Sequence, residues 1–140
     1  MLIGGTTLVI APSLLQSCTK DSSTDPNNNN NNNNNNTGGT KITIDLTNAT
    51  YSALNTVGGF KVVQSVIVAN TGSNTFVAVD SVCTHNGCTV EYSNSSSNFV
   101  CPCHGSAFSK TGSVVNGPAT SPLKSYQVSK SGDILTITIA

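Results

Sequence analysis

The sequence has no arginine and no tryptophan, and it has only two histidines among its 140 residues. Charged residues make up 9% of the chain, against about 25% in an average soluble domain, and the formal net charge is zero. Binding to nucleic acid or to acidic lipid surfaces needs clustered positive charge, which the chain lacks. Two histidines are too few for a multi-histidine catalytic metal centre with a separate base. Five cysteines, by contrast, are many for a chain of 14.3 kDa.

Residues 1–17 are predicted to be an export signal. The apolar stretch from Leu2 to Leu15 is too short and too interrupted for a membrane-spanning helix of about 20 residues. It runs into Leu15-Gln16-Ser17-Cys18, which resembles the lipobox of bacterial lipoproteins. That resemblance implies lipidation of Cys18 and an exported protein anchored to a cell-envelope membrane, on its periplasmic or surface side. No lysine or arginine precedes the apolar stretch, although export signals usually begin with positive charge. A single buried or free cysteine is the alternative interpretation.

Residues 18–40 are predicted to be a disordered tether that follows the lipidated Cys18. This segment is polar and includes ten consecutive asparagines, Asn27 to Asn36. It has too little apolar surface to offset the conformational entropy lost on folding. About 22 such residues typically reach on the order of 25 Å. An asparagine run also favours β-aggregation, which is the competing interpretation.

Residues 41–140 are predicted to form a small all-β domain, an antiparallel sandwich or barrel. Apolar residues alternate with polar ones from Lys41 to Leu46, as in a strand with one buried face. Further strands are expected at Lys61–Ala69, Thr75–Asp80, Thr89–Tyr92, Asn98–Val100, Leu123–Ser129 and Ile134–Ile139. The segment Ala49 to Val57 has room for one helical turn. Because a domain of about 100 residues has a thin core, a covalent link or a metal centre would stabilise it.

Both histidines and the four remaining cysteines fall into two short motifs. The first is Cys83-Thr84-His85-Asn86-Gly87-Cys88, and the second is Cys101-Pro102-Cys103-His104-Gly105-Ser106. Each motif lies on a loop between predicted strands, where two hairpin tips can face each other across a shared centre. Each loop would then supply one thiolate and one imidazole. A zinc site of cysteine and histidine ligands is the alternative, and it would leave two cysteines without a role.

Together the motifs resemble the two-loop signature of Rieske iron–sulfur proteins, in particular the disulfide-containing type of cytochrome bc complexes. The resemblance covers about residues 41–140 and includes Gly117-Pro118-Ala119, which is similar to the proline loop of that type. It implies a Rieske-like fold with a two-loop subdomain that binds a [2Fe–2S] cluster.

The resemblance also implies the cluster ligands. Cys83 and Cys101 would bind one iron through sulfur, and His85 and His104 would bind the other through ring nitrogen. Two thiolates and two neutral imidazoles leave the oxidised core formally neutral, whereas four thiolates would leave it doubly negative. An electron is therefore added more easily, and such centres have potentials of about −150 to +300 mV.

Four further residues receive roles from the same resemblance. Cys88 and Cys103 would form a disulfide that joins the loops, worth about 3 kcal/mol in the chain-entropy model. Disulfides need an oxidising compartment, in agreement with the export signal. Ser106 occupies the position of a hydroxyl that hydrogen-bonds a bridging sulfide. Phe108 occupies the position where high-potential members carry a tyrosine whose hydroxyl reaches a ligand sulfur, so an intermediate potential is expected.

The function expected from this resemblance is one-electron transfer at a cell-envelope membrane, without catalysis by the chain alone. The chain would be a tethered carrier, or a subunit of a quinol–cytochrome c type or other respiratory oxidoreductase. A quinol-oxidising cytochrome b-type complex and a c-type cytochrome are the partners implied. One alternative is a Rieske ferredoxin serving an oxygenase, although ferredoxins of that type resemble the pattern without the disulfide pair. Another is a structural surface lipoprotein that binds zinc or no metal.

Overall fold

The computed structural model describes residues 39–140. The predicted export signal, Cys18 and nearly all of the predicted tether lie outside the described residues. Within residues 39–140, no helix is both long enough and apolar enough to cross a membrane.

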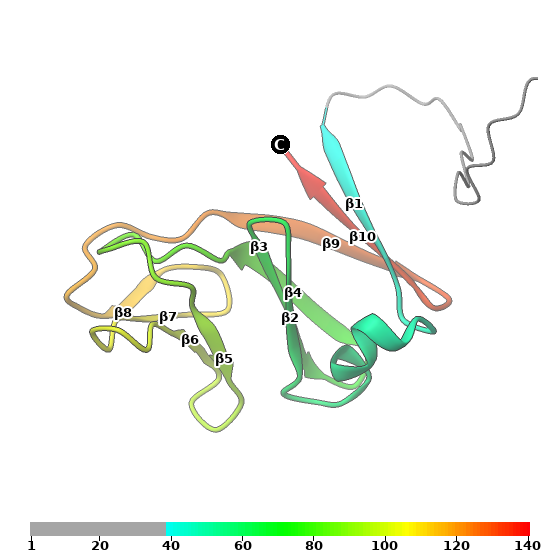
Figure 1. Ribbon diagram of the computed structural model, residues 1–140, viewed down its shortest axis with the longest axis horizontal. Coiled ribbons are helices and arrows are strands. Elements are labelled where there is room, and N and C mark those ends of the chain that lie inside the picture. The colour runs from blue at the N-terminus through cyan, green and yellow to red at the C-terminus, as the bar shows by residue number, and fades with distance from the viewer. Residues whose placement is uncertain (1–38) are drawn as a thin grey trace, which may run out of the picture. The chain divides into compact units, whose positions relative to one another are not determined.

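Six strands form the larger of two antiparallel sheets, in the order β1-β10-β9-β4-β3-β2 (Figure 1). They are β1 (Thr40–Asp45), β2 (Phe60–Val63), β3 (Val66–Gly72), β4 (Thr75–Asp80), β9 (Ser125–Ser131) and β10 (Ile134–Ile139). The first and last strands pair with each other, with Thr40 opposite Ile139. A 3-10 helix, η1 (Ala49–Asn55), follows β1 and is capped by the side chain of Asn48.

The chain between β4 and β9 forms the second sheet, in the order β5-β6-β7-β8. Its strands are β5 (Glu91–Ser93), β6 (Asn98–Val100), β7 (Ala107–Phe108) and β8 (Val114–Asn116). Figure 1 shows these strands and their loops as a lobe beside the larger sheet. We call residues 81–123 the loop lobe, because both cysteine-histidine motifs lie in it.

The β3–β4 hairpin connects the two sheets through its two faces. Val66 and Val68 of β3 belong to the core of the six-stranded sheet. Ile67 and Ala69 point the other way and share a core with residues of the loop lobe. A strand that is buried on both faces needs consecutive apolar residues, not an alternation of apolar and polar ones. β3 has such a run from Val66 to Ala69. The loop lobe is therefore packed against the larger sheet through a common core.

The all-β antiparallel fold expected from the sequence is confirmed. The alternation in the first strand is also confirmed, since Ile42, Ile44 and Leu46 are all buried. The single strand expected over Lys61–Ala69 is wrong, because a tight turn at Gln64 divides it into β2 and β3. Gln64 has a φ of 49°, and its side chain is not one that usually marks a left-handed turn position.

Candidate metal centre

The first motif forms the loop between β4 and β5. The backbone N–H of Cys83 donates to the carbonyl of Cys88 at 2.8 Å, and that of Gly87 donates back to the carbonyl of Cys83 at 2.9 Å. Gly87 has a φ of 77°, a left-handed conformation that glycine adopts without steric cost. A Cβ atom there would meet nothing within 4 Å. The backbone conformation of the loop, and not a close contact, therefore favours glycine.

The second motif forms the loop between β6 and β7 and repeats this pattern. The N–H of Cys101 donates to the carbonyl of Ser106 at 2.8 Å, and that of Gly105 donates to the carbonyl of Cys101 at 3.0 Å. Gly105 has a φ of 78°. Each motif thus folds back at its first cysteine, which holds that cysteine at the base of the loop.

The two cysteines at the loop bases are the buried thiols of the site. Cys83 is 2% exposed and Cys101 is 1% exposed, and neither is part of a disulfide. Burial opposes ionisation of Cys83, but its pKa is held below the ordinary value by hydrogen bonds to its sulfur. The donors are the backbone of His85, the side chain of Cys101, the backbone of Asn86 and the side chain of Ser106. The hydrogen bonds therefore stabilise the thiolate form of Cys83 by more than burial destabilises it, which lowers its pKa.

The two histidines lie at the exposed ends of the same loops. Their rings are side by side, with centroids 4.9 Å apart and planes 83° from parallel. His85 comes from the first loop and His104 from the second. The structure therefore brings all four predicted ligands to the facing loops, with sulfur buried and nitrogen exposed.

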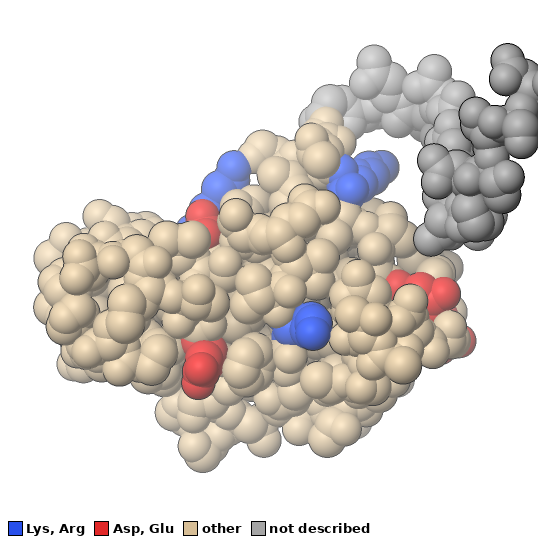
Figure 2. Space-filling model, viewed as in Figure 1, with Lys and Arg blue, Asp and Glu red and all other residues tan. Residues whose placement is uncertain are grey.

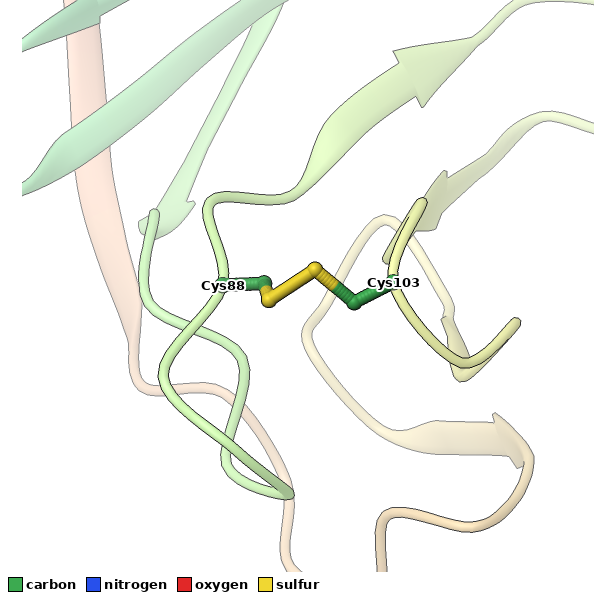
Figure 3. Close-up of a disulfide and its surroundings, with 2 residues drawn as sticks. All are labelled: Cys88 and Cys103. Carbon is green, nitrogen blue, oxygen red and sulfur yellow. A yellow bond between two sulfur atoms is a disulfide. The ribbon is translucent and has the colours of Figure 1, made fainter.

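The disulfide between Cys88 and Cys103 joins the two loops, as Figure 3 shows. Their Cα atoms are 6.5 Å apart, within the usual range for a disulfide. This predicted pairing is confirmed. It leaves Cys83 and Cys101 as the thiols available to a metal among the described residues.

A third loop, between β8 and β9, packs on the two cysteine loops. The N–H of Ala119 donates to the hydroxyl of Ser106 at 3.0 Å, and both residues are buried. The Ser106 side chain in turn hydrogen-bonds the sulfur of Cys83. The third loop therefore fixes the hydroxyl that contacts a predicted ligand.

Two further side chains hold the third loop in place, and no role had been predicted for either. The hydroxyl of Thr84 donates to the carbonyl of Ser121 at 2.6 Å. The side-chain amide of Asn116 donates to the carbonyl of Gly105 at 3.2 Å. Thr84 lies 37 residues from its partner, so no local sequence signal could have indicated the contact.

The four donor side chains suit a two-iron centre between the disulfide-linked loops better than a single zinc ion bound by all four. The two thiols are adjacent, with their sulfurs in hydrogen-bond contact, and the two imidazoles are adjacent to each other at the surface. Sulfur and nitrogen donors are therefore separated in space, as in a diiron centre that has cysteine ligands on one iron and histidine ligands on the other.

The sequence from residue 43 to residue 127, more than half of the chain, matches the family described as the Rieske [2Fe–2S] domain. The chain belongs to the Rieske family. A [2Fe–2S] cluster is therefore its cofactor, and it supplies one-electron chemistry when bound. The fold and the two facing loops described above are those of a Rieske domain.

Similar proteins include iron–sulfur subunits of cytochrome b6-f complexes. The subunit of Chlorobaculum thiosulfatiphilum is 41% identical over 77 residues, which are 55% of this chain and 42% of that protein. Subunit 1 of Synechocystis is 42% identical over 72 residues, which are 51% of this chain and 40% of that protein. The chain thus spans less than half the length of these relatives.

Among solved structures, the ferredoxin of carbazole 1,9a-dioxygenase from Nocardioides aromaticivorans has a similar fold. The likeness has a TM-score of 0.54 and covers 63% of this chain and 93% of that one. Sequence identity is 20%, so this likeness concerns the fold alone.

Proposed function

We propose that Cys83 and Cys101 bind one iron of the cluster and that His85 and His104 bind the other. Three observations support this assignment. Both cysteines are buried and free of disulfides, the two imidazole rings lie next to each other, and all four side chains come from the two facing loops. Ser106 donates its hydrogen bond to the sulfur side of the site.

We further propose that the protein is a tethered electron carrier at a cell-envelope membrane. It accepts electrons from a quinol-oxidising cytochrome b-type complex and passes them to a c-type cytochrome. The main support is the exposed pair of imidazoles, because electrons can enter and leave through their edges without crossing the buried side of the site. The names of the cytochrome b6-f relatives support a complex of this class.

The membrane part of this proposal comes from the sequence. The lipobox-like segment ending at Cys18 supports lipidation and export, and the Cys88–Cys103 disulfide is consistent with an oxidising compartment. The same disulfide argues against the alternative of a cytoplasmic ferredoxin serving an oxygenase.

One experiment tests carrier and location together. The full chain and a Cys18→Ser variant are expressed in a bacterium, and membrane and soluble fractions are compared. We expect coloured wild-type protein in the membrane fraction, with an added acyl mass, and coloured variant in the soluble fraction. The colour of the soluble variant should bleach when a quinol and a quinol-oxidising membrane preparation reduce its cluster. The colour should return when an oxidised c-type cytochrome takes the electron. Colourless protein containing zinc would contradict the electron-transfer role, and soluble wild type would contradict the anchor.

A further inference from the structure

A third sulfur lies directly beside the disulfide that joins the loops. The Sγ atoms of Cys88, Cys101 and Cys103 all lie within 4.8 Å of one another. Cys101 is not in a disulfide. A thiolate next to a disulfide can attack one of its sulfurs, so that the cross-link moves without any oxidant or reductant.

The surroundings of the two disulfide sulfurs decide which one is attacked. Attack on Cys88 would release Cys103, and attack on Cys103 would release Cys88. Cys103 is exposed, whereas Cys88 is partly buried and packs against the same core cluster that contains Cys101. A departing thiolate is better stabilised by water than by an apolar core. Attack on Cys88, with release of Cys103, is therefore favoured.

We propose that in the cluster-free chain Cys101 exchanges with this disulfide and forms a Cys88–Cys101 cross-link. The Cys101 sulfur loses its proton and bonds to the Cys88 sulfur. The Cys88–Cys103 bond breaks, and its electron pair leaves on the Cys103 sulfur, which takes up a proton. One disulfide and one thiol are present before and after, so electrons and protons balance.

The exchanged form would keep its fold but not its binding site. Cys101 and Cys103 are two positions apart in the same loop, so the cross-link still joins the same two loops. One predicted iron ligand is now consumed, and an exposed thiol has appeared at Cys103. This consequence rests on the proposed role of Cys101 as a ligand, under which a bound cluster protects the original disulfide by occupying Cys101.

Disulfide mapping tests the exchange. A full chain carrying Cys18→Ser, which removes the remaining cysteine, is prepared with its cluster and then stripped of iron by a chelator under anaerobic conditions. Samples are quenched in acid, alkylated with iodoacetamide and cleaved after Glu91, which separates the cysteines of the two loops. Fragmentation at Pro102 distinguishes Cys101 from Cys103.

We expect cluster-loaded protein to contain the Cys88–Cys103 cross-link alone. After iron removal, the Cys88–Cys101 cross-link should increase with time, together with alkylated Cys103. A cross-link pattern that stays at the cluster-loaded level for hours would overturn the proposal, as would a Cys101–Cys103 product in place of Cys88–Cys101. This time course uses the wild-type loops, so it does not depend on the folding of any loop variant.

Two variants separate the exchange from the ligand assignment. Both variants are mapped without prior cluster loading, because each lacks a proposed ligand. Cys83→Ser keeps the other three sulfurs and should still form the Cys88–Cys101 cross-link, whereas Cys101→Ser should not. Iron content gives the independent readout. If Cys101→Ser protein binds as much iron as the wild type, the ligand role of Cys101 is wrong, whatever the mapping shows.

Discussion

The hydroxyl of Ser106 is completely buried, between the N–H of Ala119 and the sulfur of Cys83. The hydroxyl oxygen accepts from the N–H of Ala119, and the hydroxyl donates its own proton to the sulfur of Cys83. This bond lowers the pKa of Cys83 and withdraws electron density from its sulfur. One residue therefore links the third loop to the electronic properties of the site.

We expect Ser106→Ala to lower the reduction potential by up to roughly 60–130 mV. A hydrogen bond to a charged group is worth about 1.5–3 kcal/mol, and about 1.4 kcal/mol corresponds to 59 mV for one electron. The variant should also lose about 1–3 kcal/mol of unfolding free energy, because the buried N–H of Ala119 loses its partner. Voltammetry and urea titration measure the two effects. Ser96→Ala, in an exposed turn, is the control, and an unchanged potential in Ser106→Ala would contradict the bond.

Phe108 belongs to the same buried core cluster as Cys83 and Cys101. We expect Phe108→Tyr to raise the potential by up to roughly 60–130 mV, because its hydroxyl would donate to a ligand sulfur. Film voltammetry of wild type and variant measures the difference. Phe99→Tyr adds the same hydroxyl to the neighbouring strand and controls for a general change in core polarity. A potential that stays the same or falls would show that Phe108 acts only through packing.

The sequence identified functional residues where they lie close together along the chain. All four proposed ligands and both disulfide cysteines lie within two six-residue motifs, so their types and spacing could be recognised directly. The contacts of Thr84 and Asn116 with distant carbonyls could not, because they depend on how the third loop returns to the site. Hydrogen bonds of this kind are set by the fold and leave no periodic pattern.

Among the elements, the two cysteine loops depend on each other through one covalent link. The disulfide closes a loop between residues 15 apart in sequence and joins segments that otherwise follow different strands. In the chain-entropy model such a link is worth about 3 kcal/mol.

Replacing both members of the disulfide, Cys88→Ala with Cys103→Ala, should therefore reduce the unfolding free energy by about 3 kcal/mol. We expect the loops to separate more readily, so the cluster should also be lost faster to a chelator. Denaturant unfolding and the decay of visible absorbance measure these effects. Wild type under reducing conditions should behave like the variant, because it also lacks the cross-link. Stability and cluster lifetime equal to those of the oxidised wild type would mean that the third loop, and not the disulfide, holds the two loops together.

Strand prediction succeeded where local pattern and tertiary environment agree. Alternate residues of β1 are buried, because this strand has one face toward the core. The period-two pattern in the sequence therefore predicts the strand correctly. The β2–β3 hairpin was missed because its turn is made at Gln64, inside a β-branched run without glycine or asparagine. The very short β7 and β8 were missed as well, since two or three residues are too few to show a period.

Over the whole described structure, charge is unevenly distributed. The loop lobe, residues 81–123, contains only two charged side chains, Glu91 and Lys110. In Figure 2 the outer end of this lobe shows no lysine, arginine, aspartate or glutamate. Electrostatic steering needs an opposing charge on each partner. Contact through the lobe should therefore depend little on salt.

We expect electron transfer to soluble redox proteins to change by less than about threefold between low and high ionic strength, whether the acceptor is acidic or basic. Steered reactions change by ~10-fold or more. Stopped-flow rates with one acidic and one basic c-type cytochrome measure this dependence. Val115→Lys places a charge at an exposed position of the lobe and should introduce opposite salt dependences for the two acceptors. A steep dependence in the wild type would place the contact outside the lobe.

The most direct test of the central claim is pulsed electron paramagnetic resonance of the reduced protein labelled with 15N-histidine. The chain has only two histidines, so the label reports on His85 and His104 alone. The ligand assignment predicts strong hyperfine coupling to two labelled nitrogens, and to one after either His85→Cys or His104→Cys. A reduced cluster without strong histidine coupling, or one that still couples to two labelled nitrogens in either variant, would contradict it.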